Sequence, residues 1–292
     1  MWSPRPVLLA LAAALVVPLV ASSPAPAAPP PVPTLVGIRA AHDDGVDRVV
    51  FEFAGGLPQV RAGYVDELIG DASGLPVRIA GRAILRLRFA PADAHDADGP
   101  TVTGRRAFAL PNVMTAVRAG DFEAVTTYGL GLAKRSPFEV STLRSPARVV
   151  VEVDAAFPTQ QRKVWFFHEE RFVDNLEPFF VPRLRPVRVQ TPATGVMDRL
   201  FAGPLPRERA DGLRLLRSRA TTFDDLSIES GIARVRLVGG CSSGGSTVTI
   251  AGSIMPSLRQ FASVDWVKIY DPAGDTASPT GSSDSIPDCL NP

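Results

Sequence analysis

The sequence predicts two domains, an N-terminal all-β, sandwich-like domain and a C-terminal α+β domain. Short segments rich in Val, Phe and Thr, separated by Gly, Pro and Asp clusters, fill residues 35–154, and this pattern is typical of a β-sandwich. From residue 163 onward, strand-like segments alternate with segments of helical periodicity, which indicates an α+β fold. The chain of 292 residues is long enough for both domains to have hydrophobic cores.

Alternation of apolar and polar residues defines the strands of the first domain. Residues 47–53, Asp-Arg-Val-Val-Phe-Glu-Phe, show this pattern and end at the turn-forming pair Gly55-Gly56. A single helical turn is expected near residues 113–119. The predicted strands are residues 34–40, 47–53, 59–65, 84–89, 122–128, 138–143 and 148–153.

The second domain is predicted to begin after a linker at residues 155–162 and to cover residues 163–273. The pair Ser230-Gly231 separates two strand-like segments, 225–229 and 232–238, and indicates a β-hairpin. Further strands are expected at residues 163–167, 184–190 and 264–270. Helices are expected at residues 194–201, 206–213 and within 246–261.

Residues 1–27 have the composition of a secretory signal peptide. Arg5 precedes a fourteen-residue apolar run, residues 7–20, and small residues follow. Cleavage fits after Ala27, with Ser22 as the second option. A helix of that run spans only about 21 Å, against about 30 Å of bilayer hydrocarbon. We therefore expect an extracytoplasmic protein without stable membrane insertion after cleavage; the alternative is an uncleaved anchor.

Residues 28–34 contain the run Pro-Pro-Pro-Val-Pro, which favours extended polyproline II geometry. This segment is interpreted as a stiff spacer ahead of the first domain. The equally weighted alternative is that it is a disordered remnant of the export signal.

The chain contains only two cysteines, Cys241 and Cys289, and outside the cytosol such a pair is expected to form a disulfide. Cys289 lies in a polar tail, residues 274–292, that cannot build a core of its own. We therefore expect the disulfide to attach this tail to the second domain. The alternative is a pair of free redox-active thiols, but the chain lacks the C-x-x-C spacing typical of that chemistry.

The charge balance excludes several classes of function. The 31 basic and 30 acidic residues leave a formal net charge of +1, so there is no electrostatic case for nucleic-acid binding. Arginine supplies 28 of the 31 basic residues, a bias typical of a GC-rich genome. Two cysteines and three histidines are too few for a multi-ligand Cys/His zinc site, and no phosphate or dinucleotide motif is present. No cofactor and no metal are predicted.

Three short motifs resemble catalytic or metal-binding sites. The segment 240–244, Gly-Cys-Ser-Ser-Gly, fits the nucleophile pattern G-x-S-x-G around Ser242, but no histidine follows it as the hydrolase order requires. The segment 93–99 resembles a calcium loop, yet Ala94 and Arg105 occupy its first and last ligand positions. His168 with two glutamates offers an acid–base pair at a strand end. No catalytic residue is predicted.

What remains is an aromatic and arginine-rich surface of the kind that binds sugars or proteins. The candidate binding residues, all in the first domain, are Tyr64, Arg105, Arg106 and Tyr128. The alternative for each is an ordinary core aromatic or a solvated arginine.

The second domain resembles the GerMN domain of spore-germination and sporulation proteins. The segments that carry this resemblance are residues 200–204, 207–213, 233–237 and 258–267. The first domain resembles the AMIN-like domain of actinobacterial secreted proteins, through residues 36–39, 47–53 and 120–123. The GerMN resemblance implies a module that is also found in lipoproteins, although this chain lacks a lipidated cysteine. The AMIN-like resemblance implies targeting to peptidoglycan or the envelope. Neither resemblance implies any catalytic residue.

We therefore expect a secreted, non-enzymatic cell-envelope protein that binds peptidoglycan or another wall glycan and recruits envelope partners. One alternative is a structural module that self-assembles in the envelope, and the sequence leaves the oligomeric state open. A second alternative is a serine hydrolase that uses Ser242.

Overall fold

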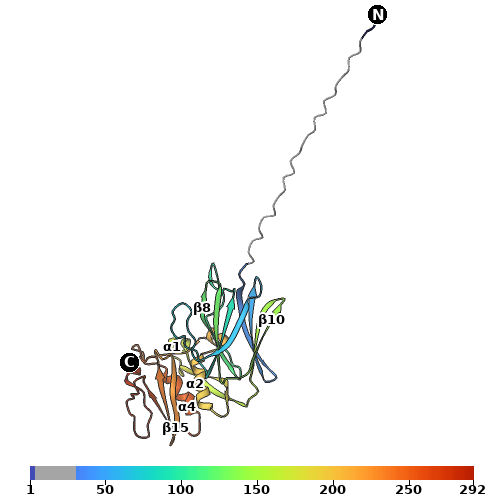
Figure 1. The fold of residues 1–292 in the computed structure, drawn as a ribbon. Coiled ribbons are helices and arrows are strands. Elements are labelled where there is room, and N and C mark those ends of the chain that lie inside the picture. The colour runs from blue at the N-terminus through green and yellow to red at the C-terminus, as the bar shows by residue number, and fades with distance from the viewer. Residues whose placement is uncertain (4–30) are drawn as a thin grey trace. The chain divides into compact units, whose positions relative to one another are not determined.

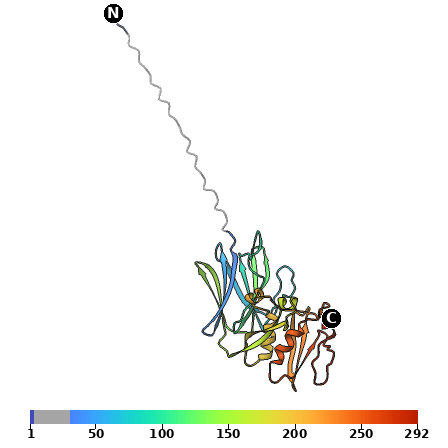
Figure 2. The ribbon, with the colours of Figure 1, turned by 180° about the vertical axis from the view of Figure 1, so that it is seen from behind.

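The computed structural model describes residues 1–3 and 31–292, and Figures 1 and 2 show the chain from opposite sides. Residues 4–27 of the predicted signal peptide and 28–30 of the predicted spacer lie outside the described residues. Both of these interpretations therefore stay predictions.

Two antiparallel sheets build the N-terminal region. The first sheet has the strand order β1-β2-β11-β10 and the second β3-β4-β9-β8-β7. The strands of the first sheet are β1 (Thr34–Asp43), β2 (Val46–Ala54), β10 (Phe138–Arg144) and β11 (Ala147–Asp154). Those of the second are β3 (Gln59–Val65), β4 (Ala83–Ala90), β7 (Arg105–Ala107), β8 (Val113–Phe122) and β9 (Val125–Leu132). A small hairpin of β5 (His95–Asp96) and β6 (Gly99–Pro100) lies between β4 and β7 in the sequence.

The alternating pattern sends one face of each sheet into a shared core. Phe51 of β2 contacts Phe89 of β4 with ring centroids 5.0 Å apart, and both side chains are fully buried. Val149 and Val151 of β11 join the same cluster from the first sheet, and Leu130 of β9 joins it from the second. The predicted β-sandwich is therefore present, and burial of these side chains stabilises it by roughly 1.5–3 kcal/mol each.

Two local predictions in this region are wrong. Residues 113–119 were expected to include a helical turn but belong to strand β8, because they pair with β9 across the sheet. Residues 122–128 were expected to be one strand but contain the β8–β9 turn. Glu123 and Ala124 adopt positive φ angles of 50° and 55° there, and neither residue type signals such a turn in a sequence.

The C-terminal region mixes strands and helices, as predicted. In chain order it contains β12 (Thr159–His168), α1 (Glu169–Val173), β13 (Phe180–Arg188), α2 (Pro192–Ala202), α3 (Pro206–Ala210), β14 (Leu213–Arg214), β15 (Thr222–Glu229), β16 (Ile232–Val238), α4 (Ala251–Arg259), β17 (Trp266–Tyr270) and a 3₁₀ turn (Asp288–Leu290). Among the residues that the structure describes, no helix has both the length and the apolar character needed to cross a lipid bilayer.

Two three-stranded sheets flank helices α2 and α4 of this region. One has the order β13-β12-β14 and the other β15-β16-β17, and α2 and α4 pack against β12 and against each other. The predicted hairpin across Ser230-Gly231 joins β15 and β16, and both turn residues have positive φ. The predicted helix 206–213 is shorter than expected, because it ends at Ala210 and Leu213 enters β14.

Helix α2 connects the N-terminal and C-terminal regions. Arg199 of α2 is 2% exposed and donates hydrogen bonds to the carbonyl oxygens of Phe108 at 3.0 Å and Pro111 at 3.1 Å. Met114 of β8 packs into the C-terminal hydrophobic cluster. Residues 31–292 accordingly form one compact unit that contains two hydrophobic clusters, and the division at residues 155–162 stays a prediction.

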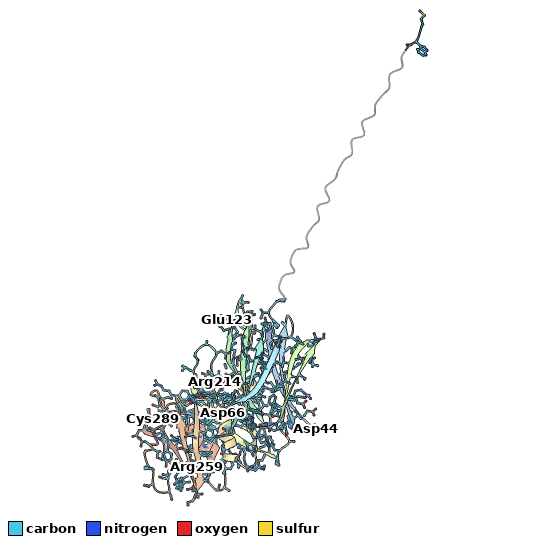
Figure 3. All side chains as sticks on the ribbon, in the orientation of Figure 1. Asp44, Asp66, Glu123, Arg214, Arg259 and Cys289 are labelled. Atoms are coloured by element: carbon cyan, nitrogen blue, oxygen red, sulfur yellow. A yellow bond between two sulfur atoms is a disulfide. The ribbon has the colours of Figure 1, made fainter. Side chains whose placement is uncertain are left out.

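The predicted disulfide between Cys241 and Cys289 is present, with Cα atoms 5.7 Å apart; Figure 3 labels Cys289. It closes a loop with a sequence separation of 48, which corresponds to about 4 kcal/mol of unfolded-chain entropy. A second attachment comes from the fully buried Lys268, whose Nζ donates to the carbonyl oxygens of Ser278 and Thr280. Asp284 and Ser285 add further contacts, because Asp284 pairs with Arg259 and Ser285 exchanges backbone hydrogen bonds with Val267 and Ile269. The tail is therefore held at several points.

Candidate functional site

Tyr64 lies near the end of β3, which is the edge strand of the five-stranded sheet. Alternation along β3 directs its ring toward the space between the two sheets, where it packs at the margin of the core. The side chain is only half-buried. Tyr64 therefore joins the core to the surface at one edge of the sandwich.

Three neighbours from residues 135–138 fix the Tyr64 ring. The guanidinium carbon of Arg135 lies 4.5 Å from the ring centroid, which is a cation–π distance. Phe138 packs edge-on, with ring centroids 5.6 Å apart. The Tyr64 hydroxyl donates to the carbonyl oxygen of Ser136 and accepts from its backbone N–H at 3.1 Å. The hydroxyl and one ring face are therefore both occupied.

Buried polar contacts hold the segment that carries Arg135. The amide nitrogen of Asn112 donates to the Ser136 hydroxyl at 3.0 Å and to the carbonyl oxygen of Asp154 at 2.9 Å. The backbone N–H of Asn112 in turn donates to the fully buried carboxylate of Asp47 at 2.6 Å. Because these partners are buried and paired, the backbone that presents Arg135 is rigid.

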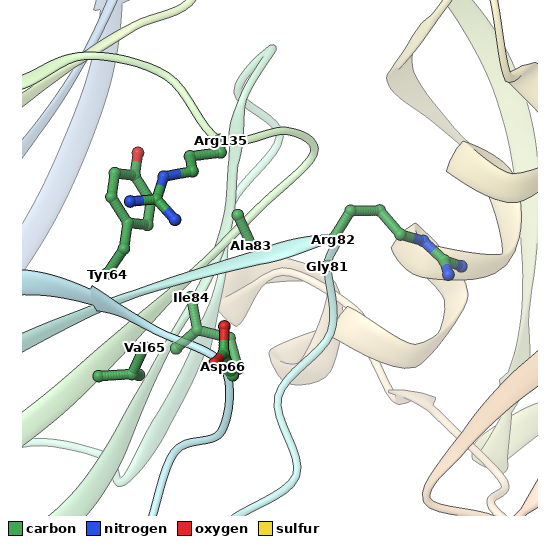
Figure 4. A pocket seen from close by; sticks show the side chains of 8 residues that line it. All are labelled: Tyr64, Val65, Asp66, Gly81, Arg82, Ala83, Ile84 and Arg135. Atoms are coloured by element: carbon green, nitrogen blue, oxygen red, sulfur yellow. The ribbon is translucent and has the colours of Figure 1, made fainter.

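A pocket of about 240 Å³ lies beside this arrangement. Figure 4 shows its eight lining residues, Tyr64, Val65, Asp66, Gly81, Arg82, Ala83, Ile84 and Arg135. A second hollow, of about 520 Å³, adjoins it on the side of Phe138, and Tyr64 and Arg135 line both. The Tyr64–Arg135 pair therefore forms the centre of an extended surface depression, which we call the Tyr64 pocket.

Gly81 and Arg82 shape the wall of the Tyr64 pocket. Gly81 has a φ of +127°, and a Cβ there would lie 2.6 Å from the carbonyl oxygen of Leu132, so a side chain at this position is excluded. The Arg82 side chain points away from the pocket in Figure 4, because its guanidinium pairs with Asp198 of α2. Of the two arginines that line the pocket, Arg135 is therefore the one whose guanidinium stays at it.

The groups in the Tyr64 pocket suit binding. An aromatic ring offers an apolar face to the C–H groups of a sugar or peptide, and a guanidinium offers two parallel donors to a carboxylate. Asp66, which is exposed, adds an acceptor for hydroxyl or amide hydrogens. The sequence could not identify Arg135 as a site residue, because its neighbour Ser136 and Tyr64 are 72 residues apart in the chain. Asp66 is close to Tyr64 in the chain, but no sequence pattern marks it as a site residue.

The predicted site residues Arg105 and Arg106 do not join Tyr64. They lie on β7, at the opposite edge of the same five-stranded sheet, which places them about 19 Å away at the usual strand spacing. The Arg105 guanidinium donates to the carbonyl oxygen of Arg78, and burial, followed by repulsion from Arg217, lowers the pKa of Arg105 to about 10.

Tyr128 is not a surface residue, and its predicted place in a binding surface is wrong. It lies on β9, the central strand of the five-stranded sheet, and its side chain is fully buried against Phe51. Burial raises the pKa of the Tyr128 hydroxyl to about 12. The sequence shows only a strand-like segment here, and central position in the sheet decides the burial.

The acidic segment 93–99 forms the β5–β6 hairpin, in agreement with the interpretation as a turn. The backbone N–H of Asp98 donates to the Asp96 carboxylate at 2.9 Å. Asp121 lies nearby and accepts from His95 Nδ1 at 2.8 Å, the backbone N–H of Ala94 and the hydroxyl of Thr126. These contacts use both Asp121 oxygens, so the cluster of Asp93, His95 and Asp121 is explained as a structural latch.

The G-x-S-x-G segment lies in a loop that does not resemble a nucleophile elbow. Strand β16 ends at Val238 and helix α4 begins at Ala251, so Ser242 is not on a sharp strand-to-helix turn. The Ser242 hydroxyl accepts from the backbone N–H of Gly244 at 3.1 Å. The backbone N–H of the next residue, Ser243, donates to the carbonyl oxygen of Cys289, which connects this loop to the disulfide-bonded tail.

Comparison with known families gives a match over residues 33–155, which contain both sheets and every residue of the Tyr64 pocket. These residues form an AMIN-like domain. Comparison with curated proteins gave no match, and comparison with solved structures gave none. AMIN-like domains are generally associated with binding to peptidoglycan or the cell envelope, and this association indicates an extracytoplasmic envelope protein.

Proposed function

We propose that this chain is a secreted, non-enzymatic envelope protein whose AMIN-like domain binds wall glycan in the Tyr64 pocket. The observation that carries this proposal is the position of the Arg135 guanidinium, stacked 4.5 Å above the Tyr64 ring. Within the described residues it makes no side-chain hydrogen bond or ion pair. Its donors are therefore free for the carboxylate of a wall sugar or stem peptide.

The composition of the pocket supports binding without turnover. Glycosidic bond hydrolysis ordinarily uses two carboxyl groups on opposite sides of the bond. Asp66 is the one carboxylate among the eight residues that line the pocket. A site with one exposed acid, one arginine and one tyrosine therefore favours a binding role over acid–base hydrolysis.

The C-terminal region is proposed to recruit an envelope partner. The resemblance of residues 163–273 to GerMN domains supports this role, as does the α+β arrangement of β12 to β17. Val173, the last residue of helix α1, is 75% exposed, and Leu176, which follows the helix, is 57% exposed. These two side chains provide apolar surface for such a contact.

Co-sedimentation with purified peptidoglycan, freed of phosphate-containing polymers, tests the proposal. We expect the full chain to sediment with it and Arg135→Gln to lose binding by about tenfold, which is the size of one charge-assisted contact. Arg144→Gln is the matched control, because Arg144 is exposed on β10 of the other sheet. Equal sedimentation of both variants, or release of soluble sugar fragments, would contradict the proposal.

A further inference from the structure

Three arginines share the outer face of strands β3 and β4, on the side of the sheet opposite to Tyr64. Arg61 lies directly across the antiparallel pair from Arg88, and Arg86 is two residues from Arg88 on the same face of β4. All three are exposed. We call this group the β3–β4 arginine face.

The β3–β4 arginine face has no acidic partner. Within residues 31–292, none of its three guanidinium groups takes part in an ion pair or a side-chain hydrogen bond. Like charges directly opposite each other across two strands destabilise a sheet. The Arg61–Arg88 pair therefore lowers the stability of the sheet and leaves about ten guanidinium N–H donors unused on one surface.

The β3–β4 arginine face is also uncovered, whereas a loop segment covers the same side of the neighbouring strand β9. Residues 66–82 cross the outer side of β9, where Leu68 lies so close to Gly129 that a Cβ there would be 2.6 Å from Leu68 Cδ2. By contrast, a Cβ at Gly63 of β3 would meet nothing within 4 Å. Gly63 pairs with Arg86, so the space outside the sheet is open beside the arginines.

We propose that the β3–β4 arginine face binds an anionic phosphodiester polymer of the envelope. Guanidinium groups bind phosphate through two parallel hydrogen bonds. Opposite residues on paired strands lie about 5 Å apart and alternate residues about 7 Å apart, so the donors form a flat array and do not converge on one ion. Such an array fits successive phosphates of an extended polymer.

Two other anionic partners fit this face less well. The outer positions of β3 and β4 carry no aromatic side chain on which bases stack, in contrast to surfaces that bind single-stranded nucleic acid. Their apolar members, Val65 and Ile84, are half-buried, so no large apolar side chain is available to enter a lipid bilayer. The polymer is therefore favoured over both.

The test uses the full chain and long-chain inorganic polyphosphate as the probe. We expect polyphosphate to bind the wild type. Its affinity is expected to fall by about tenfold or more when the salt concentration rises from about 50 to about 200 mM. Arg61→Gln with Arg88→Gln is expected to lose about tenfold at fixed salt. The matched control, Arg39→Gln with Arg144→Gln, removes the same charge from the other sheet and is expected to change affinity by less than about twofold.

Several results would overturn the inference. Equal polyphosphate affinities of the Arg61/Arg88 variant and the wild type would overturn it. An equal loss of affinity in the control variant would also overturn it, because net charge alone would then explain the effect. Tighter binding to a single-stranded oligonucleotide or to phosphatidylglycerol vesicles would replace the polymer with another partner. Protection of Arg61 and Arg88 from phenylglyoxal by polyphosphate provides a second measurement on the unaltered chain, and absence of protection would also contradict the inference.

This inference is independent of the Tyr64 pocket. Arg135→Gln is expected to leave polyphosphate affinity unchanged, and the Arg61/Arg88 variant is expected to leave sedimentation with phosphate-free peptidoglycan unchanged. Failure of one proposal is thus distinguishable from failure of the other.

Discussion

The guanidinium of Arg82 donates two hydrogen bonds to the carboxylate of Asp198, from Nε at 3.0 Å and from Nη2 at 2.9 Å. The backbone of Arg82 lies at the wall of the Tyr64 pocket, and its side chain points away from the pocket toward Asp198 on helix α2 of the C-terminal region. The AMIN-like domain and the C-terminal region are therefore joined by an ion pair that begins beside the candidate site.

The Arg82–Asp198 pair predicts a pH-dependent stability. Burial raises the pKa of Asp198 to about 6, although Arg82 opposes the shift. Because the folded-state pKa exceeds the usual value of 3.8, this group stabilises the fold most below about pH 4, and that contribution is lost as pH rises through about 6. The substitution Arg82→Gln is expected to raise the pKa of Asp198 further. The loss of unfolding free energy that it causes therefore grows with pH above about 6 and reaches about 1.5–3 kcal/mol.

Chemical denaturation of the wild type and Arg82→Gln at several pH values measures this effect. Arg78→Gln is the control, because Arg78 is exposed on the neighbouring segment and its side chain makes no bond within the described residues. A cost that is constant from acid to neutral pH would show that Asp198 does not titrate in this range.

Arg199 is expected to be necessary for the contact between the two regions. Its guanidinium is buried and donates to the carbonyl oxygens of Phe108, Leu110 and Pro111. Arg199→Met fills similar space but leaves these carbonyls without their donor, so we expect a loss of about 3 kcal/mol in unfolding free energy.

Thermal and urea unfolding of Arg199→Met measure this loss. Arg207→Met, at an exposed position of helix α3, is expected to change the unfolding free energy by less than about 0.5 kcal/mol. Similar unfolding curves for the two variants would contradict the role assigned to Arg199.

Removal of the disulfide is expected to free the tail. Cys241→Ser with Cys289→Ser removes a cross-link whose loop entropy is worth about 4 kcal/mol as an upper value. Lys268 still binds the carbonyl oxygens of Ser278 and Thr280, so we expect limited proteolysis to cut first near residue 289 and later within 274–280. Unchanged protease resistance of the whole tail would show that its non-covalent contacts, those of Lys268 and those of Asp284 and Ser285, are sufficient without the disulfide.

The His95–Asp121 pair predicts a shifted histidine titration. The hydrogen bond and charge of Asp121 raise the pKa of His95 above its usual value of 6.5. The stabilising contribution of His95 is therefore complete below about pH 6.5 and is lost as pH rises through the raised pKa. Asp121→Asn is expected to lower the pKa of His95, which proton NMR of the imidazole measures directly. An unchanged His95 titration in this variant would disprove the latch.

Strand periodicity predicted much of the sandwich. The predicted strand 59–65 matches β3 residue for residue, and the Ser230-Gly231 pair identified its hairpin because both residues adopt positive φ readily. The β8–β9 turn was missed because Glu123 and Ala124 are not typical turn residues. Sequence patterns therefore predicted strands and turns where the residue types themselves favour that backbone conformation.

The candidate site depended on contacts that no local pattern contains. Tyr64 was identified as a residue type suited to binding, but its partner Arg135 comes from the loop between strands β9 and β10. Tyr128 has the same side chain, yet its strand lies between β4 and β8, so it is buried. The order of strands in the sheet, which the sequence does not specify, separates the two tyrosines.

The most direct test is the affinity of the chain for soluble peptidoglycan fragments that carry a free carboxylate, measured for the wild type, Arg135→Gln and Arg144→Gln. We predict that Arg135→Gln binds about tenfold more weakly and that Arg144→Gln binds as the wild type does. Equal affinities of all three proteins, with folding confirmed by near-ultraviolet circular dichroism, would contradict a glycan site at Tyr64 and Arg135.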